Sequence, residues 1–290
     1  MLFLLPLLML WMLLNPALAM DAASAACRLF VTSVMPGLFP YMVLALMLVS
    51  RLSDRLPPMG LITLGWCGGS PTGARLMTLC NHNERQQLVY VGISTATMSP
   101  MFLLGTVGGW LGSRWAGAVV LGSVIIGGGL AGLLAGRFAN ENHPKLSAKL
   151  PSYRPASPHS GLQKSPPAPL SFGEAVEQAA KTMLLVCGTM VMLRVMAALT
   201  TAAWPEFTLP LTTLLEVTTG AVEIAALPLP LPLRTAVIAG ATGFGGAASV
   251  MQNRALYPPG LISLPEQLLW QAVHGGVSFL LALGAMLLTA

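Results

Sequence analysis

Long apolar runs alternate with short polar segments along this chain, and the pattern predicts membrane-spanning helices. The apolar runs cover residues 1–20, 29–50, 88–112, 116–136, 180–202, 209–227, 233–251 and 266–289. A helix needs about 20 mainly apolar residues to cross a bilayer, because no water inside the membrane satisfies exposed backbone groups. We therefore expect an all-α polytopic protein that crosses the cell membrane several times and has the lipid bilayer as its surroundings.

A polar, proline-rich segment separates the apolar runs into two groups. We expect an N-terminal membrane repeat over residues 1–136, a linker over 137–172 without a fold of its own, and a C-terminal membrane repeat over 173–290. The run 1–20 fits either an uncleaved first span or a signal peptide. It ends on the small-x-small sequence Ala17–Ala19, but no basic residue precedes its apolar part, and this favours an uncleaved span.

Composition and charge agree with a membrane protein and indicate its orientation. The chain is 54% hydrophobic and 9% charged, whereas soluble domains carry about 25% charged residues. Its net charge is +5, and the linker supplies +4 of it through Arg137, Lys145, Lys149, Arg154 and Lys164 against Glu141. Loops rich in Lys and Arg stay in the cytoplasm, so we expect a cytoplasmic linker and no nucleic-acid partner.

The segment Gly65–Arg75 is an unusual interruption between two spans, because it reads GWCGGSPTGAR. Gly68 and Gly69 allow a sharp turn, and Ser70 followed by a proline is a typical helix start. We expect a re-entrant hairpin over about residues 58–80, whose returning helix carries Thr72 and Arg75. Its positive helix end would then form an anion site. The alternative is that these glycines only pack helices closely.

Two further segments resemble this interruption. Ser99 precedes a proline inside an apolar run, which indicates either a second helix break or an ordinary proline kink. The segment Thr242–Ala255 reads TGFGGAASVMQNRA and shares the paired glycines, here Gly245 and Gly246, and a later arginine. Asn253 lies in the same segment. This similarity on the two sides of a central linker favours an internal repeat. Because the first unit has three full spans, an odd number, the second unit would enter the membrane from the opposite side and be inverted.

Ionisable residues within the apolar runs indicate a polar interior. A charge such as that of Arg194 costs about 2.5–3.5 kcal/mol at the membrane centre and requires a partner or an aqueous cavity. Glu216 and Glu223 are candidate partners for it, or carriers of a coupling ion. In the last run, Gln267, Gln271, His274 and Ser278 form one polar stripe that we expect to face the bundle interior. His274 fits either ion coupling or an interhelical hydrogen bond.

An ordered set of short motifs resembles one known family. The motifs are VMPGLFPYMVLALML, GGSPTGARLMTLC, STATMSPMFLLGTVG, SFGEAVEQAAKTMLLVCG, LLEVTTG and ATGFGGAASVMQN. They are similar, in this order, to the sporulation integral membrane protein YlbJ (SpoVV) family over residues 27–285. The chain departs from the family at Ser70, where a tyrosine is usual, and at Arg75, where a lysine is usual.

The resemblance implies membership of the nucleoside-recognition (Gate) superfamily. Its members resemble concentrative nucleoside transporters, with two inverted repeats and re-entrant helical hairpins. It also implies transport of dipicolinate, a small planar dianion, across the mother-cell-derived outer forespore membrane. The residues expected to bind this anion are Gly68, Gly69, Ser70, Thr72, Arg75, Ser99, Arg194, Gly245, Gly246 and Asn253. We expect Glu216, Glu223 and His274 to serve in ion pairing or in coupling to a proton or sodium.

Two other functions stay open at this stage. One is transport of a different small solute, such as a nucleoside. The other is a non-transporting membrane scaffold needed for the spore envelope or cortex, which predicts fully paired polar groups and no cavity. No catalytic motif, metal site or cofactor motif is present in the sequence, so we expect no enzyme. The sequence leaves the oligomeric state undetermined.

Overall fold

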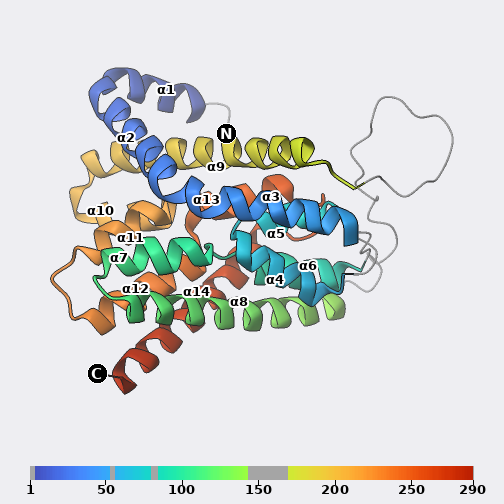
Figure 1. Ribbon diagram of the computed structural model, residues 1–290. Helices are drawn as coiled ribbons and strands as arrows, with labels where there is room; N and C mark the ends of the chain where they lie inside the picture. The colour runs from blue at the N-terminus through green and yellow to red at the C-terminus, as the bar shows by residue number, and fades with distance from the viewer. Residues whose placement is uncertain (1–3, 53–55, 80–83, 143–168, 290) are drawn as a thin grey trace.

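Every regular element in the described part of the chain is a helix, as the apolar runs predict. The computed structural model describes residues 4–52, 56–79, 84–142 and 169–289. Its helices form one bundle, in which α9 and α8 lie along opposite sides (Figure 1). Of the linker expected over residues 137–172, residues 137–142 are instead helical and continue α8, and residues 143–168 lie outside the described residues.

Four helices in the described chain are long and apolar enough to cross a membrane. They run over Pro16–Leu52, Arg114–Ala139, Phe172–Ala203 and Leu264–Leu288. Even the 25-residue helix is about 38 Å long, which exceeds a hydrocarbon core of about 30 Å. Leucines on these helices face outward, since Leu44, Leu184 and Leu280 are 64%, 73% and 67% exposed. These features fit a multi-pass membrane protein.

The N-terminal part differs from the expected spans over 1–20 and 29–50. Helix α1 (Leu4–Leu14) ends before Asn15, and Pro16 begins α2 (Pro16–Leu29) because proline suits the first helical position. Helix α2 then continues through the π-helical turn η1 (Phe30–Val34) into α3 (Met35–Leu52). A single 37-residue helix thus replaces the boundary expected near residue 20, and α1 is too short to span.

The remaining helices are short, and four of the connections between them are breaks within the bundle. The first break separates α4 (Pro58–Gly68) from α5 (Thr72–Met77), and the second separates α6 (Arg85–Ser94) from η2 (Phe102–Val107), which leads into α7 (Gly108–Trp110). The third break separates α10 (Thr208–Leu215) from α11 (Val217–Ala225). The fourth separates α12 (Leu231–Phe244) from α13 (Gly246–Leu256).

The expected span over 233–251 is therefore divided at Gly245. The run over 88–112 is divided at residues 95–99, which is the helix break that Ser99 offered as one alternative. The run over 209–227, for which the sequence left open a full span or a re-entrant element, is divided at Glu216.

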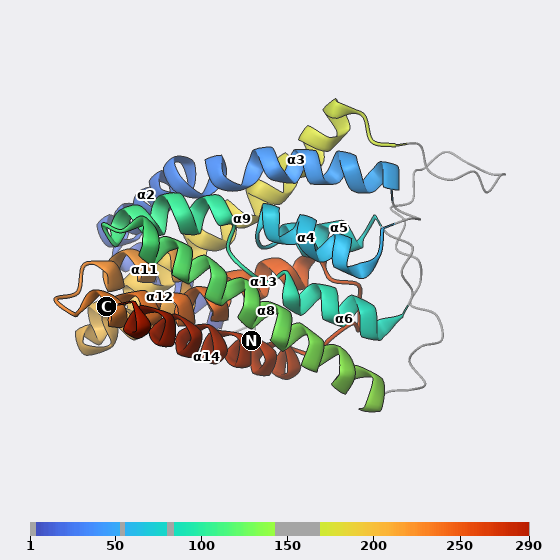
Figure 2. The same ribbon diagram turned by 60° about the horizontal axis from the view of Figure 1, so that its bottom comes forward.

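Small residues allow the longest helices to pack closely. Helix α14 (Leu264–Leu288) contacts α12 and α8 (Arg114–Asn142) along much of its length, as Figure 2 shows. A Cβ on Gly127 would lie 2.5 Å from Ser278 Oγ, and one on Gly275 would lie 2.7 Å from the Gly240 carbonyl oxygen. The polar stripe of α14 faces this interface: Gln267, Gln271, His274 and Ser278 are fully buried, which confirms the expected inward orientation.

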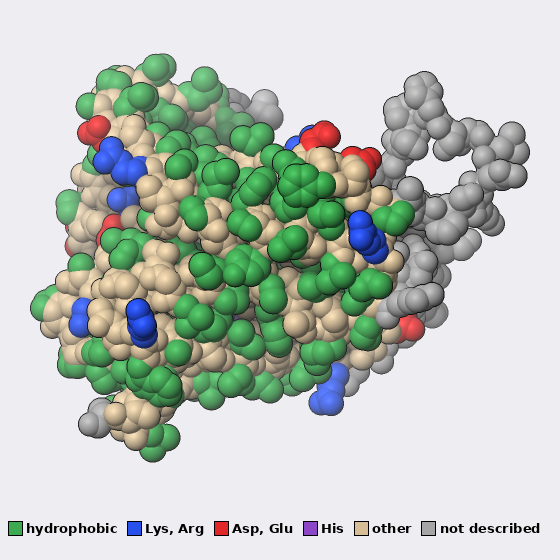
Figure 3. Space-filling model, viewed as in Figure 1, with side chains coloured by type: hydrophobic (Ala, Val, Ile, Leu, Met, Phe, Trp, Pro, Cys, Tyr) green, Lys and Arg blue, Asp and Glu red, His purple; other side chains and the backbone are tan. Residues whose placement is uncertain are grey.

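The bundle has two distinguishable ends. We call the linker end the one where α8 stops at Asn142 and α9 (Phe172–Ala203) begins (Figure 1). Arg51 near the end of α3 and Arg85 at the start of α6 lie at this end, whereas Arg114 begins α8 at the opposite end. On the face in Figure 3, most charged side chains lie toward the two ends and hydrophobic side chains cover the middle. A bilayer would match that middle band.

The turn at Gly69 provides a test of the packing between two of the breaks. Gly69 has a φ of +68°, and a Cβ there would lie 2.5 Å from the backbone nitrogen of Ser99. We expect Gly69→Ala to destabilise the protein by about 1–3 kcal/mol, through backbone strain and steric overlap. Thermal unfolding in detergent measures this. Gly109→Ala is the matched control, because no atom lies within 4 Å of its added Cβ. Equal unfolding temperatures for the two variants would contradict the packing described.

Candidate functional site

The four helix breaks meet in the middle of the bundle. The amide nitrogen of Ser70, between α4 and α5, donates to the carbonyl oxygen of Thr97, between α6 and η2. In the second half of the chain, a Cβ added to Gly246 would lie 3.1 Å from the carbonyl oxygen of Leu214 and 3.2 Å from that of Thr213. The break at Gly245 therefore lies against the break at Glu216, and glycines permit both close approaches.

A buried network of hydroxyl and amide groups joins the two halves of the chain. Ser70 Oγ lies 3.1 Å from Ser249 Oγ and donates to Asn253 Oδ1 at 3.1 Å. The Asn253 amide also donates to Ser249 Oγ at 3.4 Å. All three side chains are at least 94% buried, since their exposed fractions are 6%, 3% and 1%. Residues about 180 positions apart in the chain thus share one polar cluster.

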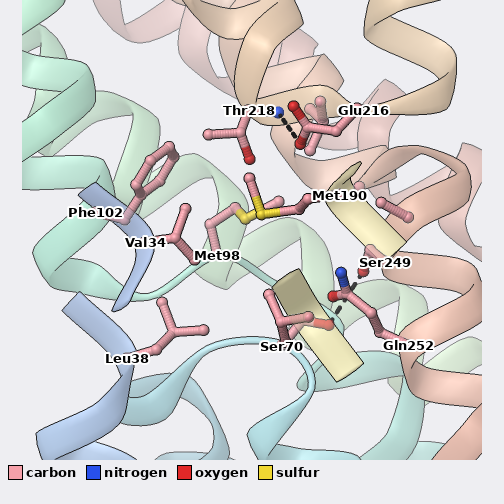
Figure 4. A pocket seen from close by; sticks show the side chains of 14 residues that line it. Val34, Leu38, Ser70, Met98, Phe102, Met190, Glu216, Thr218, Ser249 and Gln252 are labelled. Carbon is pink, nitrogen blue, oxygen red and sulfur yellow. Dashed lines mark hydrogen bonds between the residues drawn. The ribbon is translucent and has the colours of Figure 1, made fainter. Parts of the chain in front are cut away.

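A small cavity lies at this junction (Figure 4). Its volume is about 30 Å³, which is room for about two water molecules. Ser70, Ser249 and Gln252 line one side, and Glu216 and Thr218 line the other. Met98 and Met190 lie between these two polar sides and fill the centre.

Glu216 is a buried carboxylate, only 1% exposed, at the break between α10 and α11. It caps α11 by accepting from the backbone nitrogens of Thr218 at 2.9 Å and Thr219 at 2.8 Å. The Thr219 hydroxyl also donates to it, at 2.6 Å. Within the described residues, no cationic side chain forms a salt bridge with Glu216. Its stabilisation therefore comes from the helix end, where a negative charge is favoured.

Seven of the residues expected from the sequence lie at this junction. They are Gly69, Ser70, Ser99, Gly245, Gly246, Asn253 and Glu216. Ser99 Oγ accepts from the backbone nitrogen of Phe102 at 3.2 Å, so the serine–proline pair begins a helix at Pro100, which is the first of the two alternatives that the sequence left open. Thr72 and Gly68 pack against each other immediately beside the junction.

The expected capping role of Ser70 is wrong. Helix α5 begins at Thr72, with Pro71 in the capping position and no side-chain cap. The Ser70 hydroxyl instead contacts α13. Because α5 has only six residues, its aligned peptide dipoles sum to little, and it does not provide the strongly positive helix end expected over residues 71–80.

The two arginines expected in the site lie away from the central cavity. Arg194 forms an ion pair with Glu223, with Nη1 3.3 Å from Oε1, which is the alternative the sequence offered for it. Arg75 donates from Nη2 to Gln178 Oε1 at 3.0 Å and lines a separate cavity at the linker end. Among the described residues, the lining of the central cavity thus includes hydroxyl, amide and carboxylate groups but no arginine or lysine.

His274 belongs to the interface of α14 and α8 and is remote from the cavity lining. Its Nε2 lies 2.9 Å from the carbonyl oxygen of Val124, so the interhelical hydrogen bond is present. Its Nδ1, and both side-chain polar atoms of Gln271, have no hydrogen-bond partner among the described residues. Fully buried polar groups of this kind are rare in proteins and are usually satisfied by water.

Sequence reasoning missed Ser249, Gln252, Met98 and Met190. Ser249 and Gln252 have a sequence signal, since together with Asn253 they follow helical spacing on one face of α13. The methionines have none, because Met is common in apolar runs throughout this chain, with 17 in total.

No protein-family model, curated protein or solved structure matches this chain. The fold and the site define a class: an all-helical multi-pass membrane protein whose broken helices meet at a polar site inside the bundle.

The capping role of Glu216 can be tested by substitution. We expect Glu216→Ala to lower the free energy of unfolding by about 0.5–2 kcal/mol, because the first turn of α11 loses its acceptor. Glu216→Gln keeps one acceptor oxygen and should lose less. The measurement is thermal unfolding in detergent micelles. Glu177→Ala is the control, since its 2.6 Å pair with Lys181 is exposed and contributes little. Unfolding of Glu216→Ala at the wild-type temperature would contradict this role.

Proposed function

We propose that the chain is a secondary transporter of a small organic solute, with the central cavity as its binding site. The observation that carries this proposal is the meeting of four helix breaks at one buried polar cavity. Irregular backbone at membrane depth is tolerated only where it is buried in protein or lines a cavity. Transporters use such broken helices near the bilayer midplane to contact the solute.

In this proposal the chain consists of two inverted repeats. The first unit is the long α2–α3 helix, the pair α4–α5, the broken span α6–α7 and the long α8. The second unit repeats this order with α9, the pair α10–α11, the broken span α12–α13 and α14. The pairs α4–α5 and α10–α11 pack within themselves in opposite halves of the bundle, so they serve as re-entrant hairpins from opposite sides (Figure 1). The linker joins the units.

This assignment changes which segments correspond. The sequence similarity pairs Thr242–Ala255 with the Gly65–Arg75 segment between α4 and α5. The order of the elements instead pairs α4–α5 with α10–α11. The break at Gly245 then corresponds to the break around Ser99. Residues of all four breaks line or adjoin the central cavity, and Ser70 of the first unit bonds to Ser249 and Asn253 of the second.

Dipicolinate is the proposed substrate, on the basis of the resemblance to the YlbJ family. Hydroxyl and amide donors from Ser70, Ser249 and Gln252 would face its carboxylates. Glu216 would repel a dianion unless a cation accompanies it, so we assign Glu216 to the coupling ion, a proton or sodium. The membrane would be the outer forespore membrane.

A cavity of about 30 Å³ is too small for dipicolinate, so the described arrangement is a closed one. Opening requires the two polar sides to separate or the two methionines between them to change rotamer. Methionine suits this role, because its unbranched side chain has three rotatable bonds. The helix ends at the breaks lack the continuous hydrogen-bond ladder that makes an intact helix rigid.

A nucleoside-like solute is a second candidate, because the described residues that line the cavity include no cationic side chain. The scaffold alternative has less support. It requires complete pairing of polar groups, yet the buried hydroxyls of Thr72 and Thr97 have no partner among the described residues.

Uptake of radiolabelled dipicolinate into proteoliposomes, under a proton or a sodium gradient, tests the proposal. We expect saturable uptake by the wild type. Ser70→Ala and Asn253→Ala should each lower uptake efficiency about two- to tenfold, since each removes neutral hydrogen bonds. Ser24→Ala, at an exposed position of α2, is the matched control and should transport normally.

Competition by unlabelled nucleosides distinguishes the two solutes. Nucleosides that inhibit the uptake share the site with dipicolinate, whereas uptake of a radiolabelled nucleoside without any uptake of dipicolinate would transfer the proposal to the second candidate. If the folded wild-type protein takes up neither solute under either gradient, the scaffold function would replace transport.

A further inference from the structure

Helix α2 lies near the end of the bundle opposite the linker end (Figure 1), and a groove runs along its exposed face. The volume of the groove is about 390 Å³, within the range of small-molecule sites. The residues that line it belong to α2 and to the following turn η1, and they are Asp21, Ser24, Ala25, Arg28, Leu29 and Thr32. None of them lines the central cavity.

The polar side chains of this groove carry both signs of charge. Asp21, Ser24 and Arg28 are exposed and follow helical spacing, so they lie on one face of the helix. Thr32 continues this face, and its hydroxyl donates to the Arg28 carbonyl oxygen at 2.8 Å. Among the described residues, neither Asp21 nor Arg28 forms a salt bridge. The groove therefore presents one carboxylate and one guanidinium that a ligand can contact.

The charges of the long helix Pro16–Leu52 place this groove at the edge of the bilayer. Residues 29–50 contain no charged side chain. They extend about 33 Å by helical rise, which matches a hydrocarbon core of about 30 Å. Arg28 and Arg51 therefore lie at opposite edges of the core, and the groove lies at the level of the lipid headgroups. Trp115 and Trp204 are half exposed at the same end of the bundle, as tryptophans at a membrane interface are.

The exposed face of this helix changes from apolar to polar in the order that a phospholipid does. Val31 and Met35 follow Ser24 and Arg28 by two helical turns and are 58% and 37% exposed, so the face is apolar toward the core. Outward from there come the Thr32 hydroxyl, the guanidinium, the Ser24 hydroxyl and the carboxylate of Asp21. In phosphatidylethanolamine the corresponding order is acyl chains, ester groups, phosphate and primary ammonium.

We propose that this groove binds the headgroup of phosphatidylethanolamine, with its phosphate on Arg28 and its ammonium on Asp21. The planar guanidinium matches the oxygens of a phosphate, and a carboxylate accepts charge-assisted hydrogen bonds from a primary ammonium. The quaternary ammonium of phosphatidylcholine has no N–H to donate, and phosphatidylglycerol has no cationic group. The order of charges along α2 thus selects one headgroup. This site is independent of the proposed transport.

Native mass spectrometry of the full-length protein, titrated in detergent with one lipid at a time, tests the site. The lipids are dioleoyl phosphatidylethanolamine, phosphatidylcholine and phosphatidylglycerol, which differ only in the headgroup. We expect the first to bind about two- to fivefold more tightly than the other two, the range of an exposed charge pair. Arg28→Gln should weaken the binding of all three, because each contains a phosphate. Asp21→Asn should lower the affinity for phosphatidylethanolamine to that for phosphatidylcholine.

The double variant Asp21→Arg with Arg28→Asp keeps both charges and reverses their order, so it should lose the preference for phosphatidylethanolamine. Arg114→Gln is the matched control, because Arg114 is exposed at the same end and does not line the groove. It should bind all three lipids like the wild type. Unchanged unfolding temperatures verify that the variants are folded.

Equal binding of the three lipids by the wild type would overturn the proposal. So would a preference that survives in Asp21→Asn or in the reversed double variant, or an equal weakening by Arg114→Gln. The same spectra report the oligomeric state. A dimer that Arg28→Gln dissociates, with no preference among the lipids, would assign the groove to a second copy of the chain and overturn the lipid site.

Discussion

The structure depends on satisfying backbone groups where helices stop inside an apolar bundle. Each break exposes amide and carbonyl groups that lipid cannot satisfy. The chain solves this by bringing the breaks together, so that the amide of Ser70 bonds to Thr97 and the carboxylate of Glu216 bonds to the first amides of α11. The break at Ser70 is satisfied by a neighbouring break, and the break at Glu216 by its own side chain. The polar site is a consequence of these contacts.

Glycines allow the helix breaks to approach one another closely, because they have no side chain at the contact points. A Cβ on Gly73 would overlap Thr95, and one on Gly65 would lie 2.5 Å from the same threonine, so α4 and α5 can both approach the break after α6. Gly220 has the same relation to Thr213 across the break at Glu216. Threonine against glycine thus recurs at two of the junctions, where a short β-branched side chain fills the space beside bare backbone.

Much of the fold could be predicted from the sequence, because apolar length and helix signals are local properties. The all-helical bundle and the inward-facing stripe of α14 follow from the spacing of apolar and polar residues alone, whereas Ser99–Pro100 allowed either a helix break or a simple kink. The roles of Ser70 and Arg75 could not be predicted from the sequence. Ser70 has the residue type and position of a helix cap, but its hydroxyl forms hydrogen bonds with Ser249 and Asn253 of α13, far away in the sequence. Arg75 lies at the end of a helix too short to place it in the centre. Tertiary contacts determine the roles of these two residues, and such contacts cannot be inferred from local sequence patterns.

The separation of charges in this molecule has a physical reason. A guanidinium is always ionised and costs several kcal/mol at the membrane centre unless it is paired or hydrated, so permanent positive charge is tolerated more easily near an aqueous end. Arg75 and Arg254 are placed in this way, and Arg194 is neutralised by Glu223. Among the described residues, the lining of the central cavity has hydroxyls, an amide and the carboxylate of Glu216. For the proposed transport, weak and neutral contacts at the junction would allow a solute to dissociate from the centre, which a pair of arginines at the midplane would oppose.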